Sequence, residues 1–313
     1  MRPLHERKRY LTFNKHLKEI FGERVYKISI DAGLTCPNRD GTKGNTGCIY
    51  CSGNRSTSQP VEKTAMLERM RVGWKALHRK YKAHKFLVYF QSYTNTYAPL
   101  DVLEDLYTTA LAEKYIVGLA IGTRPDCVPE PVLDLVGTLA QQHYLWVEYG
   151  LQSVHEQTLQ LIRREHTYAD FLDAVVRTQQ RPDIKICVHV ILGLPGETKA
   201  DMLDTARTLS GLGIHGVKIH SAHVLKNTLL AQMYDRGEYR PMELDEYVET
   251  VCDFLEYLSP DIIIHRLIGD APRKYYIAPE WSLHKSEAVT RIDLEFERRG
   301  TFQGSRLKTE GRF

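Results

Sequence analysis

Short apolar runs alternate with longer amphipathic segments along the first three quarters of the chain. The apolar runs contain few polar residues and have the length of strands, so they predict strands that are covered on both faces of a parallel sheet. We expect these strands at residues 25–30, 85–90, 116–121, 145–149, 184–192 and 216–220. The amphipathic segments predict helices at residues 61–82, 100–113, 129–142, 155–163, 168–179 and 199–211.

This alternation predicts an α/β fold with six β/α units between about residues 24 and 238. Six units are too few to close a regular eight-unit barrel, so the expected fold class is a partial (β/α)6 TIM-like barrel of parallel strands. A basic amphipathic N-terminal helix at residues 5–21 precedes the barrel, within a unit at 1–23. A C-terminal extension at 239–313 follows, with a helix at 243–258, a candidate strand at 262–264 and no clear period beyond.

Three of the six cysteines fall in one loop, from Cys36 to Cys51, just after the first strand. The loop is rich in Gly, Asn, Asp and Pro, which is typical of irregular structure. Three interpretations compete for Cys36, Cys48 and Cys51: incidental apolar residues, a structural zinc site, or ligands of a [4Fe–4S] cluster. Zinc would need a fourth ligand, and Cys127 is distant in sequence. The aromatic Tyr50 immediately before Cys51 and the preceding strand favour the cluster.

Polar residues also follow the other strands, where parallel barrels place their sites. Gln91 and Ser92 follow the second strand, while Thr123 and Arg124 follow the third and could meet a carboxylate or phosphate. Glu148 lies inside an otherwise apolar strand, where an ionised carboxylate is unfavourable unless it is paired. Strand alternation would put Gln152 on the same face as Glu148.

Three clustered cysteines that end in Cys-x-aromatic-Cys after the first strand resemble the radical S-adenosylmethionine (SAM) superfamily. The common spacing is three residues and then two, whereas here it is eleven and then two. This departure resembles the elongator-like (Elp3-like) branch and, more closely, the bacterial YhcC/YtqA-type group. Glu148-x-Gly-x-Gln152 followed by Arg164, and Gly193-Leu-Pro-Gly-Glu197 after the fifth strand, match signatures of related enzymes.

The resemblance implies that Cys36, Cys48 and Cys51 ligate three irons of a [4Fe–4S] cluster whose fourth iron binds SAM. Reduction by a flavodoxin- or ferredoxin-type donor would then cleave SAM to methionine and a 5′-deoxyadenosyl radical. The catalytic residues on the substrate side stay unknown. The resemblance and the strand positions together predict these SAM contacts: Tyr50, Gln91, Ser92, Thr123, Arg124, Glu148, Gln152, Arg164, His189, Gly193, Lys218 and His220.

Composition indicates the compartment in which the protein is expected. Hydrophobic residues make up 42% of the chain and charged residues 26%, which is typical of globular proteins. No apolar stretch approaches the roughly 20 residues of a membrane span, and the first ten residues lack the apolar core of a signal peptide. Clustered thiols without a disulfide framework indicate a reducing compartment. We therefore expect a cytoplasmic protein with no membrane partner.

Charge is unevenly distributed along the chain. Residues 1–85 contain 19 Lys/Arg and 7 Asp/Glu, and residues 86–313 contain 23 and 32. The excess of positive charge in residues 1–85 suggests either a solvated basic surface or contact with nucleic-acid phosphates. The elongator-like resemblance implies that such a nucleic acid is tRNA, modified at a uridine base. Alternatives are a small-molecule radical enzyme and a non-enzymatic metal- or RNA-binding protein. The predicted phosphate contacts are Arg7, Lys8, Arg9, Lys75, Arg79, Lys80 and Lys82.

Overall fold

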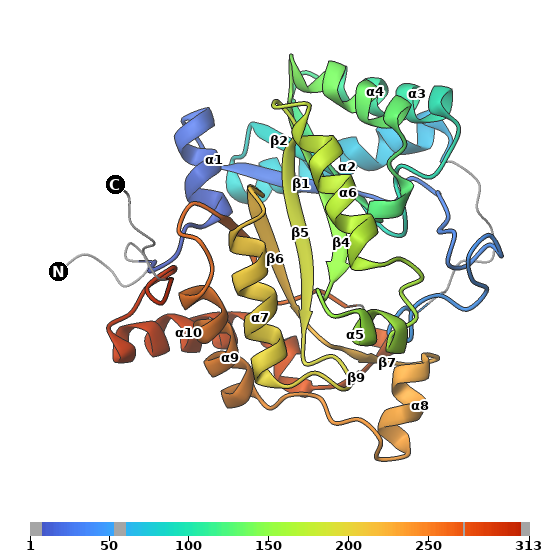
Figure 1. Ribbon diagram of the computed structural model, residues 1–313. Helices are drawn as coiled ribbons and strands as arrows, with labels where there is room; N and C mark the ends of the chain where they lie inside the picture. Colours follow the sequence, from blue (N-terminus) through green and yellow to red (C-terminus); the bar gives the residue numbers. More distant parts are fainter. Residues whose placement is uncertain (1–7, 53–60, 272, 308–313) are drawn as a thin grey trace.

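A curled sheet of seven parallel strands forms the centre of the molecule (Figure 1). The computed structural model describes residues 8–52, 61–271 and 273–307. Six strands match the predicted ones within a few residues, which confirms the α/β partial-barrel fold class, and the candidate strand at 262–264 is present as β8, a seventh strand at one edge. In spatial order the strands are β1 (Val25–Ile30), β2 (Lys85–Phe90), β3 (Ile116–Thr123), β4 (Tyr144–Gln152), β5 (Lys185–Leu192), β6 (Gly216–Ser221) and β8 (Ile263–Arg266).

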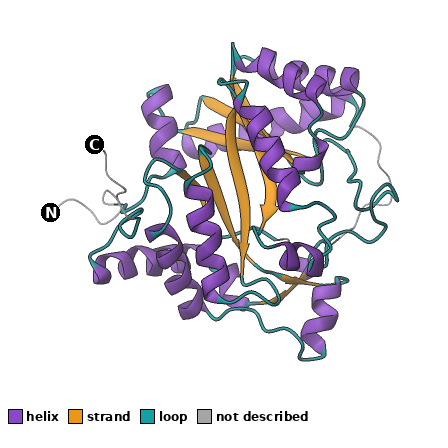
Figure 2. Cartoon of the chain, viewed as in Figure 1, coloured by secondary structure: helices purple, strands orange, loops and turns teal. Residues whose placement is uncertain are grey.

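Helices cover the outer face of the sheet (Figure 2). The strand side chains that face them occupy alternate apolar positions such as Leu145, Val147 and Tyr149, all fully buried. No helix among the described residues is long and apolar enough for a membrane crossing. The main helices are α2 (Lys63–Tyr81), α3 (Leu100–Leu111), α4 (Glu130–Ala140), α5 (Glu156–Leu161), α6 (Tyr168–Gln179), α7 (Lys199–Ser210), α8 (Leu229–Asp235), α9 (Leu244–Glu256) and α10 (Lys285–Arg299).

The predicted N-terminal helix starts later than expected, as α1 (Phe13–Phe21). The prediction was wrong for residues 8–12, because this segment runs beside β8: Ile264 N–H donates to Leu11 O at 2.7 Å, and Thr12 bridges Ile264. The Thr12 hydroxyl accepts from Lys15 N–H and begins the helix. Residues 5–7 lie outside the described residues. Phe13 of α1 stacks on His265 and meets Trp146 edge-on inside the barrel.

The C-terminal segment is more ordered than its sequence suggested. Its helix α10 buries Ala288, Ile292 and Phe296, spaced by four residues. Before it, β9 (Tyr276–Ala278) pairs antiparallel with the short strand β7 (Val224–Leu225). Figure 1 shows β7 and β9 below the lower ends of β5 and β6, near the carboxyl ends of the central strands.

Candidate functional site

A cavity of about 570 Å³ opens at the carboxyl ends of the strands. Its volume lies in the range typical of cofactor and substrate sites. All three loop cysteines line it, together with ten of the twelve predicted SAM contacts. Those ten are Tyr50, Gln91, Ser92, Thr123, Arg124, Glu148, Gln152, Arg164, His189 and His220.

The cysteine loop folds back on itself, which brings cysteines eleven residues apart to one wall. Asn38 organises the fold: its carbonyl oxygen accepts from Gly47 N–H at 2.8 Å, and its side-chain Nδ2 donates to Arg163 O at 2.7 Å. The same Nδ2 lies 3.5 Å from Cys48 Sγ. A tight turn, Cys51 N–H to Cys48 O at 2.9 Å, joins the last two cysteines. The long spacing is therefore compatible with a single three-thiol site.

Cationic side chains face the sulfur atoms. Arg164 Nη1 lies 3.5 Å from Cys48 Sγ, and Arg39 Nη1 lies 3.6 Å from Cys51 Sγ. Burial, with a further contribution from the neighbouring Cys48, raises the pKa of the Cys51 thiol to about 11, while Arg39 opposes the shift. A metal that displaces the thiol proton would remove this penalty and would leave thiolates facing two guanidinium groups.

Arg164 is held in place by the carboxyl end of β4. Its Nε and Nη2 donate to Gly150 O at 3.1 and 2.6 Å, and the side chain is buried. Gly150 permits this approach, because a Cβ there would lie 2.6 Å from Arg164 Nη2. Arg164 thus links the sheet to the cysteine loop. Its guanidinium donates to Cys48 Sγ and to the β4 backbone and does not extend freely into the cavity.

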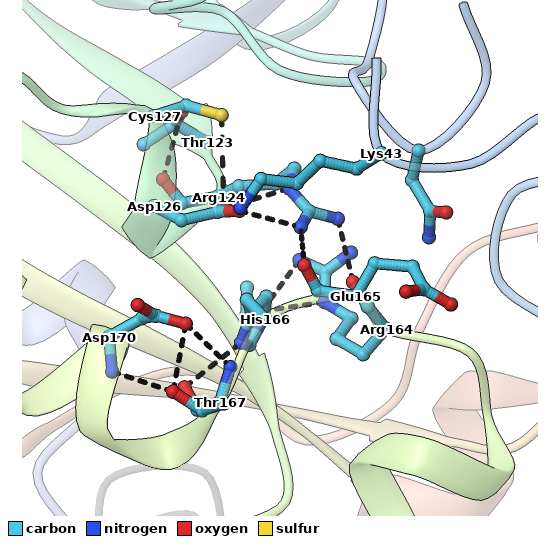
Figure 3. Close-up of polar contacts among 12 residues, drawn as sticks. Lys43, Thr123, Arg124, Asp126, Cys127, Arg164, Glu165, His166, Thr167 and Asp170 are labelled. Carbon is cyan, nitrogen blue, oxygen red and sulfur yellow. Dashed lines mark hydrogen bonds and ion pairs between the residues drawn. The ribbon is translucent and has the colours of Figure 1, made fainter. Parts of the chain in front are cut away.

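Arg124 lies beside this arrangement and is bound within the protein (Figure 3). Its guanidinium forms a two-bond ion pair with Asp126, at 2.9 and 2.8 Å, and donates to the backbone oxygens of Arg164 and Glu165. These bonds engage three of its nitrogens with protein oxygens, so its contribution is to fix the 164–165 turn. Burial and the two guanidinium groups lower the pKa of His166 in the same cluster to about 3, which keeps its ring neutral.

The floor of the cavity is a buried ionic layer around Glu148. The carboxylate accepts from Lys27 Nζ at 3.2 Å and His189 Nε2 at 2.9 Å, and forms an ion pair with Lys218. Although burial opposes ionisation, the two lysines and the hydrogen bond from His189 keep the pKa of Glu148 well below its ordinary value. Burial lowers the pKa of Lys218 to about 7 and, with Lys218, that of His189 to about 4.

Glu148 is therefore paired, as expected for a carboxylate inside an apolar strand. Ligand atoms of Glu148, Cys187 and His265 lie within 4.8 Å of one another, but two ammonium groups already occupy the carboxylate. A cation site there is therefore disfavoured by like-charge repulsion.

The end of β6 and the segments after it and before β9 build another wall of the cavity. It includes His220, His223, Asp270 and Tyr275. Burial lowers the pKa of His223 to about 4 and that of His220 far below its usual value, so both rings are neutral near pH 7. His220 Nε2 is buried and, among the described residues, has no hydrogen-bond partner. This wall offers a ligand the unpaired nitrogen of His220 and the ring of Tyr275, whereas His223 Nε2 is bonded to Ser221 Oγ at 2.9 Å.

Unpaired polar atoms near the cysteines also suit a polar cofactor. Thr94 Oγ1 and Asn95 Oδ1 are buried without hydrogen-bond partners in the described part of the chain, and both residues line the cavity. Buried polar groups are rarely left unpaired. Three sulfurs on one wall and unpaired oxygens beside them fit a thiolate-ligated cluster with an amino-acid-like ligand such as SAM.

Two predicted SAM contacts lie elsewhere. Lys218 lies below the cavity surface, with its ammonium 3.8 Å from the centre of the Tyr89 ring. Gly193, predicted to let the backbone approach adenosine, instead makes room for Met242: a Cβ would lie 2.8 Å from its side chain, and the φ of Gly193 is +79°. The structure therefore gives Gly193 a packing role, and the cavity wall described above does not include it.

The predicted phosphate contacts are far from the cavity or already engaged. Lys8 forms an ion pair with Asp293, Arg9 donates to Thr301 O, and Arg7 is outside the described residues. The other four are exposed in the last turns of α2 or at its end, and β2 begins just after them. They therefore lie toward the amino end of β2, and none of them lines the cavity. Those four are Lys75, Arg79, Lys80 and Lys82.

Several site residues were not singled out from the sequence. Lys27 had a usable signal, since it is a charge inside a strand, as Glu148 is. Asn38 and Arg39 had none, because polar residues are ordinary in a turn-rich loop. Tyr275 reaches the cavity only through the pairing of β7 with β9, which local sequence patterns do not reveal.

Comparisons with known proteins agree with this geometry. The Radical SAM superfamily model matches residues 40–209, and the Radical_SAM C-terminal domain model matches residues 214–298. The chain is 41% identical to YtqA of Bacillus subtilis over 95% of its own length and 92% of YtqA. It is 31% identical to a tRNA uridine(34) acetyltransferase of Methanocaldococcus jannaschii over 51% of its length and 30% of that protein. The solved structure of archaeal Methanocaldococcus infernus Elp3 with an N-terminal deletion shares the fold, with a TM-score of 0.63, 17% identity, and coverage of 89% of this chain and 64% of that one.

Proposed function

This chain belongs to the radical SAM superfamily, and we propose that it modifies tRNA, at a uridine base. It is a radical SAM enzyme whose cofactors are a [4Fe–4S] cluster and SAM. When bound, they supply one-electron cleavage of the SAM sulfonium to methionine and a 5′-deoxyadenosyl radical that takes hydrogen from the substrate. Family membership also removes the non-enzymatic alternative.

The chain's own residues prepare the site for that chemistry. Cys36, Cys48 and Cys51 would hold the cluster, and Arg164 and Arg39 would stabilise the charge on its thiolates. Unpaired atoms in the wall would bind the polar end of SAM. The electron would come from a flavodoxin- or ferredoxin-type donor, in the cytoplasm, where reducing conditions keep free the cysteines that the structure shows unpaired.

The observation that carries the tRNA proposal is the wall formed by His220, His223 and Tyr275 inside the cysteine-lined cavity. Proteins recognise single bases by stacking them on aromatic rings and bonding to their edges. The unpaired Nε2 of His220 and the ring of Tyr275 supply both kinds of contact. The relative named a tRNA uridine(34) acetyltransferase adds support for the substrate class, although the match covers only 30% of it, so no acetyl transfer is carried over.

The test compares tRNA nucleosides from cells with and without the gene, by mass spectrometry. We expect one modified uridine to disappear in the deletion strain and to return with the wild-type gene but not with Cys48→Ala. Identical nucleoside profiles would reject the tRNA proposal and leave the radical chemistry standing.

A small-molecule substrate is the second candidate. The observation in its favour is the cavity of about 570 Å³ beside the three cysteines, a volume typical of small-molecule sites. In that case, 5′-deoxyadenosine production by the reconstituted enzyme would rise with a cell metabolite extract and be insensitive to tRNA.

A further inference from the structure

A small basic rim borders the cavity where β7 and β9 pair. Lys226 N–H donates to Tyr275 O at 2.7 Å, which places residue 226 beside the segment 273–275. Leu225 and Tyr275 line the cavity, while their chain neighbours Lys226 and Lys274 are exposed. Arg273 is exposed as well. Three cations thus lie within two residues of the cavity wall.

These cations differ from other basic residues nearby. Arg236 and Arg240 pair with Glu238 and Glu246, and Lys285 pairs with Asp270. Lys226, Arg273 and Lys274 have no ion-pair partner among the residues that the structure describes. Their only described side-chain contact is the Lys274 ammonium, 4.6 Å from the centre of the Tyr275 ring. The rim is positive although residues 86–313 as a whole carry a net negative charge.

We propose that the rim of Lys226, Arg273 and Lys274 binds the phosphates of an RNA substrate and that Tyr275 stacks on the base that enters the cavity. This inference rests on the proposed tRNA function and replaces the phosphate contacts expected on α2. Ammonium and guanidinium groups neutralise phosphates without reading sequence, and an aromatic ring beside them accepts a base. Phosphates on the rim would lie within two residues of the wall that receives the base, whereas the four predicted α2 cations lie toward the amino end of β2 and do not line the cavity.

The test measures binding of bulk bacterial tRNA to the anaerobically reconstituted enzyme across a range of salt concentrations. The rim variant is Lys226→Gln/Arg273→Gln/Lys274→Gln. The matched control removes three exposed cations at the amino ends of the strands, as Lys18→Gln/Arg24→Gln/Lys114→Gln. A third variant neutralises the four α2 cations. All substituted positions are exposed, so thermal melting should confirm that each variant folds.

We expect the rim variant to lose at least tenfold in affinity at about 0.1 M salt and to flatten the slope of log K against log salt by about 2–3, for three phosphate contacts. The control should stay within about twofold. Tyr275→Ala should weaken binding without changing the slope, because stacking releases no counterions. Full affinity in the rim variant, or a loss confined to the α2 variant, would overturn the proposal.

Two further outcomes distinguish failure of the rim proposal from failure of the proposed tRNA function. If the wild-type enzyme binds no tRNA even at low salt, the proposed function fails and the rim proposal with it. If tRNA binds the rim variant normally but flavodoxin no longer reduces its cluster, the rim is a docking site for the electron donor, and only the present inference is overturned.

Discussion

Replacing Glu148 by Gln should destabilise the protein more than any single change in its lysine partners. The glutamine side chain would have nearly the same shape but no charge, so the buried Lys218 and the half-buried Lys27 would be left without an anion. Removing one partner of a buried ion pair typically costs about 3–5 kcal/mol. We therefore expect Glu148→Gln to lower the free energy of unfolding by about that amount.

A double-mutant cycle measures the interaction between Glu148 and Lys218 directly. Lys218→Met removes one of two cations and leaves Glu148 with Lys27 and His189, so it should cost less than about 2 kcal/mol. In Glu148→Gln/Lys218→Met the stranded ammonium is gone, and the double variant should be more stable than Glu148→Gln by about 1–3 kcal/mol. The assay is urea unfolding of the apoprotein at pH 6, where Lys218, with a pKa of about 7, is protonated, followed by circular dichroism under anaerobic conditions.

The same layer predicts a dependence on pH. The pKa of Lys218 is about 7 when folded, below its ordinary value of 10.5, so the unfolded chain binds its proton more tightly between those values. The wild-type protein should therefore gain stability relative to Lys218→Met as pH rises from 7 to 9, by up to about 1.4 kcal/mol per unit. Strictly additive substitutions, or a pH-independent difference, would refute the account of this layer.

Three other perturbations test the supports of the cavity. Gly150→Ala should displace Arg164 and cost about 2–3 kcal/mol in urea unfolding, whereas Gly211→Ala, with no atom closer than 3.8 Å to the added Cβ, should change stability little. Asn38→Ala should loosen the cysteine loop and speed iron loss to a chelator at least severalfold; an unchanged rate would contradict its role. Because the pKa of His166 is about 3 when folded and 6.5 when unfolded, its contribution to stability is lost as pH falls below 6.5. His166→Gln should therefore flatten the decline in the urea midpoint between pH 7 and 5, and parallel declines would argue against it.

The sheet was predictable because its strands are continuous apolar runs. Leu87 and Val147 lie in such runs and are fully buried, and the alternating helices leave a parallel arrangement as the natural solution. Errors occurred where local pattern and tertiary contact disagree. The basic stretch before Thr12 has a helical pattern, but its backbone instead bonds to Ile264. Helix α10 was missed because few apolar positions, Phe296 among them, mark its buried face.

The candidate site was predictable where it depends on residue type and strand ends. The three cysteines and Glu148 were found in this way, and the structure places all four around one cavity. Residues that reach the site through distant pairing were not found, because no local pattern joins Leu225 to Tyr276. The segment charge of residues 1–85 pointed to α2, since composition carries no information about position in space.

The central claim is that Cys36, Cys48 and Cys51 together hold a [4Fe–4S] cluster that binds SAM. The most direct measurement is electron paramagnetic resonance of the reduced, reconstituted enzyme with and without SAM, together with iron analysis. We predict about four irons per chain and a spectrum that changes when SAM is added. Cys48→Ala should lose the irons and the spectral change with SAM. Cys127→Ala, which removes a free thiol outside this cavity, should keep the irons and the spectral change. A cluster that survives in Cys48→Ala, or one that is lost in Cys127→Ala, would contradict the account.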